Sequence, residues 1–123
     1  MISPARLGKS ILVIEDDPLI RGAMRMVLQW EDYRVTCVTN GQEALDFLRA
    51  SAPPDIILLD MRMPVLDGWE FLEQQKQDPL LADIPVIVVT GSEELVYGSA
   101  AQIQKPFHPH QLLEAIRQQM TGQ

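Results

Sequence analysis

The sequence predicts an α/β fold in which a parallel sheet carries helices on both of its faces. Short apolar runs rich in branched residues alternate along the chain with segments whose apolar residues recur at helical spacing. The runs are continuous, as is typical of parallel strands that are covered on both faces. Right-handed crossovers join such strands, and ligands bind at their carboxyl ends, near the point where the strand order reverses.

Five segments are the predicted strands, and in chain order they are 11–14, 33–38, 55–60, 85–90 and 100–103. The first helix is predicted to open at Pro18, because proline suits the first helical position. Its apolar residues recur at i, i+3, i+4, i+7 and i+8, and they are Ile20, Ala23, Met24, Val27 and Leu28. This spacing puts them on one stripe, which we expect to face the sheet.

Three further helices follow from similar signals. A second helix around Ala44, Leu45 and Leu48 is predicted to end before Pro53, a third is predicted over 69–77, and the last over 109–120. Only residues 91–99 remain to join the fourth and fifth strands, whereas a crossover between parallel strands usually needs about 10 to 12 residues. We therefore expect the fourth helix of the alternation to be absent or at most one turn, near 93–97.

The composition fits one domain, predicted over 10–120 with short tails at 1–9 and 121–123. The chain of 123 residues carries 10 Lys and Arg against 17 Asp and Glu, so its net charge is −7 with neutral histidines. Such a surface repels phosphate backbones and anionic lipid headgroups, so we expect neither nucleic acid nor a membrane as a partner.

The apolar runs are four or five residues long, far below the roughly 20 that a membrane span needs. The first nine residues do not lead into the apolar core of a signal peptide. Cys37 is the only cysteine and cannot form an internal disulfide, which agrees with a reducing compartment. We therefore expect a cytoplasmic protein.

Three acids are predicted to meet at the carboxyl edge of the sheet. Asp16 and Asp17 follow the first strand, and Asp60 ends the third. Two unit charges about 4 Å apart repel by roughly 4 kcal/mol at an effective dielectric constant of 20, so this cluster favours raised pKa values or a hard cation. Oxygen ligands with room for water suit Mg²⁺. Taken alone, Asp17 before Pro18 fits a helix N-cap equally well.

A hydroxyl and an amine are expected beside the three acids. Thr90 ends the fourth strand, and Lys105 precedes the last helix. Together with a metal ion they can neutralise and hydrogen-bond a phosphoryl group, which the carboxylate of Asp60 can attack. The edge of the sheet is thus a candidate site for phosphoryl transfer.

At these residues the chain resembles the receiver domain of two-component response regulators, the group that includes the single-domain bacterial chemotaxis regulator. The resemblance rests on four motifs in order and covers nearly the whole chain, from residue 10 to residue 120. The motifs are ILVIEDDP, DIILLDMRMPVLDG, VIVVTG and KPF. It implies a flavodoxin-like, doubly wound sheet of five strands in the order 2-1-3-4-5, with the fourth helix shortened or absent.

The resemblance also implies a role for each matching residue. Asp60 matches the aspartate that accepts a phosphoryl group from a phosphohistidine on a sensor kinase or a phosphotransfer protein. Asp16 and Asp17 match the acidic pair that holds Mg²⁺ with Asp60, and the backbone carbonyl of Arg62 matches a further ligand. The resemblance thus implies a signalling switch that acts by contact with a downstream protein. The only reactions that such a protein catalyses are its own phosphoryl transfer and dephosphorylation.

Thr90 matches the hydroxyl that turns toward the phosphoryl group, and Lys105 matches the lysine that contacts it, in a cis bond to Pro106. The chain departs from the family at Gln102, where an aromatic switch residue is usual, and in the short segment between Thr90 and Lys105. Phosphoryl acceptance is therefore expected, whereas the usual relay from threonine to aromatic ring is not.

Two other functions fit parts of the pattern. One is an interaction module of the same fold that acts without phosphorylation, which the altered switch region favours. The other is a small phosphohydrolase with an aspartyl-phosphate intermediate. Hydrolases of that kind have a second acid two residues after the nucleophile, and this chain has Arg62 there.

Overall fold

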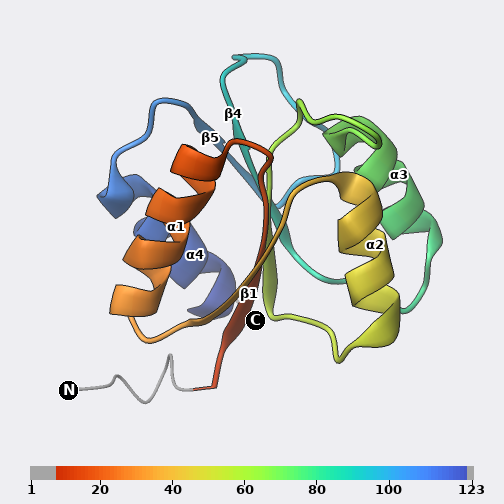
Figure 1. Ribbon diagram of the computed structural model, residues 1–123, viewed down its shortest axis with the longest axis horizontal. Helices are drawn as coiled ribbons and strands as arrows, with labels where there is room; N and C mark the ends of the chain where they lie inside the picture. The colour runs from red at the N-terminus through yellow and green to blue at the C-terminus, as the bar shows by residue number, and fades with distance from the viewer. Residues whose placement is uncertain (1–7, 122–123) are drawn as a thin grey trace.

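The computed structural model describes residues 8–121, which form a five-stranded parallel sheet between two pairs of helices (Figure 1). The strands are β1 (Ser10–Ile14), β2 (Arg34–Val38), β3 (Ile56–Leu59), β4 (Val86–Thr90) and β5 (Ala101–Gln104). The helices are α1 (Pro18–Trp30), α2 (Gly41–Ala50), α3 (Gly68–Gln77) and α4 (Pro109–Thr121). The strand order is β2-β1-β3-β4-β5, which confirms the predicted fold class and topology. Of the predicted tails, residues 1–7 and 122–123 lie outside the described residues.

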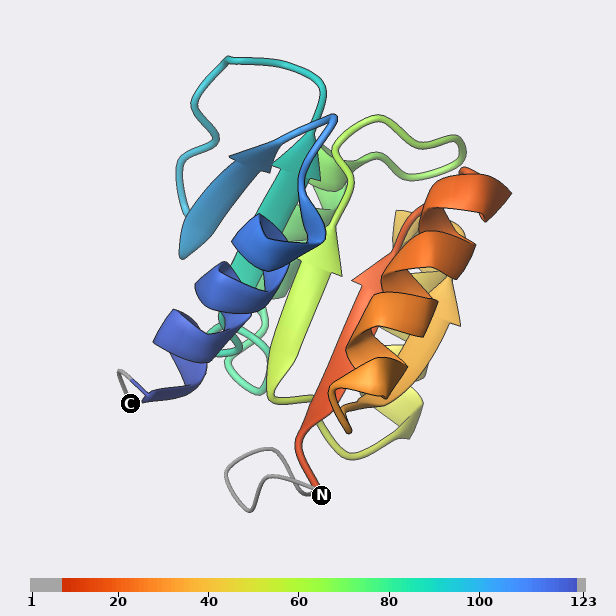
Figure 2. The same cartoon turned by 90° about the vertical axis from the view of Figure 1, so that its left-hand side faces the viewer.

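The two faces of the sheet carry separate apolar cores. Leu12 and Ile14 of β1 pack toward α2 and α3, whereas Ile11 and Val13 pack toward α1 and α4. Figure 2 shows α1 and α4 together on one face of the sheet. Because successive side chains of a strand point to opposite faces, a strand covered on both sides needs apolar residues at every position. This explains the uninterrupted runs in the sequence.

Side-chain caps start three of the helices. Asp17, Asn40 and Asp67 each accept hydrogen bonds from backbone amides of the first turn, as residues at N-cap positions do. The third cap is reciprocal, since Glu70 also accepts from the Asp67 amide. At Gly68 a Cβ atom would lie 2.6 Å from the Cα of Met61, so only glycine lets α3 start this close to the end of β3. Within the loop between them, Val65 has a φ of 70° and an exposed side chain.

The connection from β4 to β5 contains no helix, in agreement with the shortness of residues 91–99 (Figure 2). Val96 from this connection fills the core on the α3 side. Ala101 and Ile103 of β5 pack on the opposite face, so Gln102 and Gln104 occupy the α3 side. Because β5 presents amides rather than apolar side chains there, it does not need a covering helix. No helix among the described residues is long and apolar enough to cross a membrane.

Gln75 of α3 is fully buried and ties the helix to the turn before β4. Its Nε2 donates to the carbonyl oxygens of Leu81 at 2.7 Å and Ile84 at 3.2 Å. We expect Gln75→Leu to leave both carbonyls without this donor and to lower the free energy of unfolding by about 1 to 2 kcal/mol. Urea denaturation measures this. Gln77→Leu, an exposed change in the same helix, should cost less than about 0.5 kcal/mol, and equal losses in the two variants would contradict the assignment.

Candidate phosphoryl-transfer site

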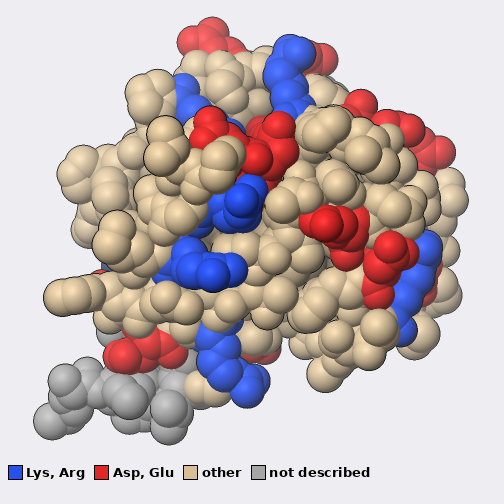
Figure 3. All heavy atoms as spheres, in the orientation of Figure 1, with Lys and Arg blue, Asp and Glu red and all other residues tan. Residues whose placement is uncertain are grey.

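Three carboxylates meet where β1 and β3 end. The amide of Asp60 donates to the carbonyl of Ile14 at 3.0 Å, which fixes the end of β3 beside the end of β1. Carboxylate oxygens of Glu15, Asp16 and Asp60 all lie within 4.8 Å of one another. Glu15 and Asp60 are buried, whereas Asp16 is exposed. Figure 3 shows acidic side chains gathered over the turn between β1 and α1, so the cluster opens to solvent at the edge of the sheet.

The third predicted acid, Asp17, serves the helix instead. Its Oδ1 accepts from the amide of Leu19 at 2.9 Å and from the amide of Ile20 at 3.3 Å. The Asp17 carboxylate thus binds backbone amides in the first turn of α1. Glu15 occupies the place in the carboxylate cluster that the sequence predicted for Asp17. The physical reason is that β1 ends at Ile14 and Pro18 takes the first helical position, so the residue between them that caps the helix is Asp17.

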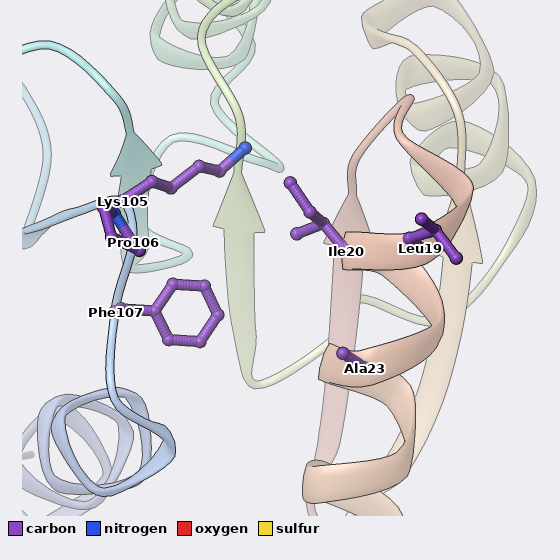
Figure 4. Close-up of a pocket in the computed structure, with 6 residues that line it drawn as sticks. All are labelled: Leu19, Ile20, Ala23, Lys105, Pro106 and Phe107. Atoms are coloured by element: carbon purple, nitrogen blue, oxygen red, sulfur yellow. The ribbon is translucent and has the colours of Figure 1, made fainter.

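Lys105 joins the cluster from the loop after β5. Its Nζ lies 2.7 Å from Oε1 of Glu15 and 3.5 Å from Oδ1 of Asp60. Figure 4 shows this side chain extended toward the end of β3. The Lys105 amide donates to the carbonyl of Thr90 at 2.7 Å, and the bond between Lys105 and Pro106 is cis, as the resemblance implied. One ammonium therefore faces three carboxylates.

Thr90 and Arg62 lie at the same edge of the sheet. Thr90 is the last residue of β4 and is buried, and its Oγ1 accepts from the amide of Ser92 at 3.3 Å. The amide of Arg62 donates to Oδ1 of Asp60 at 3.4 Å, while the Arg62 side chain is exposed. The Asp60 carboxylate is thus held by a backbone amide of the loop that follows β3.

Burial and charge act against each other in the Glu15 and Lys105 pair. Burial, with a smaller contribution from the charge of Asp60, raises the pKa of Glu15 to about 7, although the hydrogen bond and the charge of Lys105 oppose this. For Lys105, burial alone lowers the pKa, but the hydrogen bond to Glu15 and the charges of Glu15 and Asp60 outweigh it, so its pKa is raised. The metal-free site is thus short of positive charge.

This donor set fits a magnesium ion. All three side chains offer carboxylate oxygens, which Mg²⁺ prefers, and the exposed side of the cluster leaves room for the water molecules that it retains. A divalent cation would favour the charged form of Glu15, against the burial and the smaller repulsion from Asp60 that raise its pKa.

Sequence reasoning gave no role to two residues that the structure places here. Glu15 is one of them, although its position directly after an apolar run was a usable signal. The other is Arg21, whose guanidinium donates to the carbonyl oxygens of Glu15 at 3.0 Å and Asp16 at 3.2 Å. Arg21 lies one turn into α1 and fastens the acidic loop to the helix.

We expect the stability of the metal-free protein to report the burial of Glu15. The pKa of Glu15 is raised from 4.5 in the unfolded chain to about 7 in the fold, so its protonated form stabilises the fold and this contribution is lost as the pH rises through about 7. Lys105, with a raised pKa, contributes equally throughout this range. Urea denaturation in a chelator should therefore show Glu15→Gln gaining stability relative to the natural protein between about pH 5 and 8.

Glu73→Gln is the matched control, because Glu73 is exposed on α3. A stability difference that does not change with pH in Glu15→Gln would show that the carboxyl group of Glu15 titrates normally.

Sequence comparison places the chain among signalling proteins. The profile of a family described as the response regulator receiver domain matches residues 11–117. The chain is 35% identical over 118 residues to the polar-differentiation response regulator DivK of Brucella anthropi, across 90% of this chain and 95% of DivK. It is 32% identical to the phosphate regulon transcriptional regulatory protein PhoB of Pseudomonas aeruginosa, across 90% of this chain and 51% of PhoB. It thus spans nearly all of one relative and about half of the other.

A solved structure shares the architecture. The receiver domain of a sensor histidine kinase from Pseudomonas aeruginosa matches with a TM-score of 0.85 at 28% identity, over 94% of this chain and 99% of that one. That structure holds a magnesium ion coordinated in its active site cleft.

Proposed function

Because the chain belongs to the response regulator receiver domain family, we propose that it accepts a phosphoryl group on Asp60 from a phosphohistidine donor and so switches its contacts with a downstream protein. One observation carries the proposal. The buried Asp60 carboxylate lies in a cluster with two other carboxylates and has the ammonium of Lys105 at 3.5 Å. The lone Cys37 favours the reducing cytoplasm as the place of the reaction.

Glu15, Asp16 and Asp60 are the side chains that would hold the magnesium ion, with the backbone carbonyl of Arg62 as a further ligand. Asp17, which the sequence offered for this role, keeps its carboxylate on the amides of α1. When bound, the ion supplies positive charge that offsets the oxygens of an incoming phosphoryl group.

The protein's own groups account for the remaining chemistry. A carboxylate oxygen of Asp60 attacks phosphorus, the bond from phosphorus to the donor's imidazole nitrogen breaks, and that nitrogen keeps the electron pair and takes up a proton. Lys105 neutralises charge on the phosphoryl oxygens. Thr90 donates its hydroxyl proton to one of them, and because its Oγ1 now accepts from Ser92, this contact links the site to the segment after β4.

The phosphodonor has an apolar docking place beside the site. Leu19, Ile20 and Ala23 of α1 line a groove of about 430 Å³ together with Phe107, and Ile20 points toward the loop that carries Phe107 (Figure 4). Lys105 lines the same groove, and its Nζ reaches Asp60. A helical donor seated there would bring its phosphohistidine to the carboxylate.

We expect Leu19→Glu to slow transfer from a phosphorylated histidine phosphotransfer domain by about tenfold, because a charge replaces an apolar contact at the groove. Leu19 is 84% exposed, and a glutamate in the first turn of a helix is favourable, so the fold should be unaffected. Phosphorylation by a small acyl phosphate should keep its rate. Leu80→Glu, at an equally exposed leucine far from the groove, is the control, and equal slowing in both variants would exclude this docking place.

Intact mass measurement after incubation with Mg²⁺ and an acyl phosphate tests the function itself. We expect a labile gain of one phosphoryl group. An unchanged mass would favour an interaction module that works without phosphorylation, and continued release of phosphate from unrelated phosphate esters would favour a hydrolase.

A further inference from the structure

A second groove lies between α3 and the connection from β4 to β5, on the side of the sheet opposite α1. It measures about 370 Å³ and is lined by Trp69, Leu72, Glu73, Lys76, Glu94, Leu95, Val96 and Tyr97. Leu72 and Val96 belong to the core and form its floor. We call it the α3 groove. It shares no lining residue with the groove beside Lys105.

The α3 groove exists because a loop replaces a crossover helix. Gln102 of β5 holds this loop with both ends of its amide: Nε2 donates to the carbonyl of Glu94 at 2.6 Å, and Oε1 accepts from the amide of Val96 at 2.9 Å. The loop is thereby pinned at 94–96, and Tyr97 stands beyond it with 90% of its surface exposed. The flank of α3 that a neighbouring helix would cover stays open.

The walls of the groove carry three exposed apolar side chains, those of Trp69, Leu95 and Tyr97. Trp69 is 41% exposed, and Leu95 is 71% exposed. Two aromatic rings and a leucine around a preformed hollow are the features by which a helix-in-groove partner is anchored. Scattered apolar residues need no such explanation, but these gather on one hollow.

The rim of the groove is acidic. Glu73 and Glu94 are exposed, and neither carboxylate forms an ion pair within residues 8–121. The basic residue of the lining, Lys76, directs its ammonium to the carbonyl of Ala82 at 3.4 Å. The two carboxylates outnumber the one ammonium, so the charged residues of the lining carry a net charge of −1, which complements a basic partner.

We propose that the α3 groove binds an amphipathic, basic helix of a protein partner. The apolar side chains of that helix pack against Trp69, Leu95 and Tyr97, and its lysines or arginines approach Glu73 and Glu94. The partner takes the place that a crossover helix leaves empty. Binding does not require Asp60, so the surface can be tested on the unphosphorylated protein.

The probe is a labelled peptide of about 15 residues with leucines at i, i+4 and i+7 and lysines between them. Fluorescence anisotropy at low salt should show it binding, and a peptide with glutamates in place of the lysines should bind at least about tenfold more weakly. Tyr97→Ser and Glu73→Lys should each weaken the lysine peptide, the first by about tenfold or more. Amide shifts in NMR spectra should change in 69–76 and 92–97.

Two matched variants control for non-specific hydrophobic binding and for the change in net charge. Trp30→Ser removes an equally exposed aromatic ring from α1, and Asp46→Lys reverses an exposed helical charge on α2. Both should bind the lysine peptide as the natural protein does. Absence of binding, equal losses in test and control variants, or shifts confined to α1 and Phe107 would overturn the proposal. Self-association that Tyr97→Ser abolishes would also overturn it, since the occupant would then be a second copy of the chain.

Discussion

The Asp60→Asn variant is expected to show no gain of mass under conditions in which the natural protein gains one phosphoryl group. An amide keeps the size of the side chain but is a far weaker nucleophile than a carboxylate, so the step that forms the oxygen to phosphorus bond is lost. The fold should persist, because the substitution removes one of three repelling carboxylates. Intact mass spectrometry measures the difference directly.

Asp67→Asn is the matched control for this experiment. Asp67 caps α3 on the same loop, and asparagine caps helices about as well as aspartate, so this variant should be phosphorylated like the natural protein. A phosphoryl group that survives in Asp60→Asn, or disappears equally in Asp67→Asn, would place the acceptor elsewhere.

Asp16→Asn and Asp17→Asn are expected to differ sharply in magnesium binding, although the two residues are adjacent. Asp16 lies in the carboxylate cluster, and loss of a direct ligand should weaken Mg²⁺ binding by at least about tenfold. Asp17 holds amides of α1, and asparagine replaces it well at that position, so binding should change by less than about threefold. Isothermal titration with Mg²⁺ separates the two outcomes.

Both variants remove one negative charge at neighbouring positions, so each serves as the charge control for the other. Equal weakening would mean that the ion responds to the general field of the loop. The reverse order would return Asp17 to the metal site, as the sequence suggested.

The sheet could be predicted because its signal is local. A run such as Ile11 to Ile14 is apolar at every position, as a strand covered on both faces requires, and all four residues are buried. The carboxyl-edge location of Asp60, Thr90 and Lys105 then follows from the parallel topology. The length of 91–99 likewise predicted the missing helix.

Two features of the site depended on contacts that the sequence does not display. Three consecutive acids follow β1, and the turn between β1 and α1 decides that Glu15 and Asp16 enter the cluster while Asp17 caps the helix. The sequence shows that Gln102 is unusual at its position. Its two hydrogen bonds to the loop at 94–96 could not be predicted, because they depend on how β5 is placed beside that loop in the folded sheet.

The backbone of Val65 has a consequence for the loop that follows Asp60. A branched side chain in the left-handed region costs on the order of 1 to 2 kcal/mol, and the surrounding fold sustains this cost in the resting molecule. Any rearrangement that lets Val65 relax would recover that energy. A new contact at Asp60 would therefore need to supply less free energy to rearrange the loop that carries Val65.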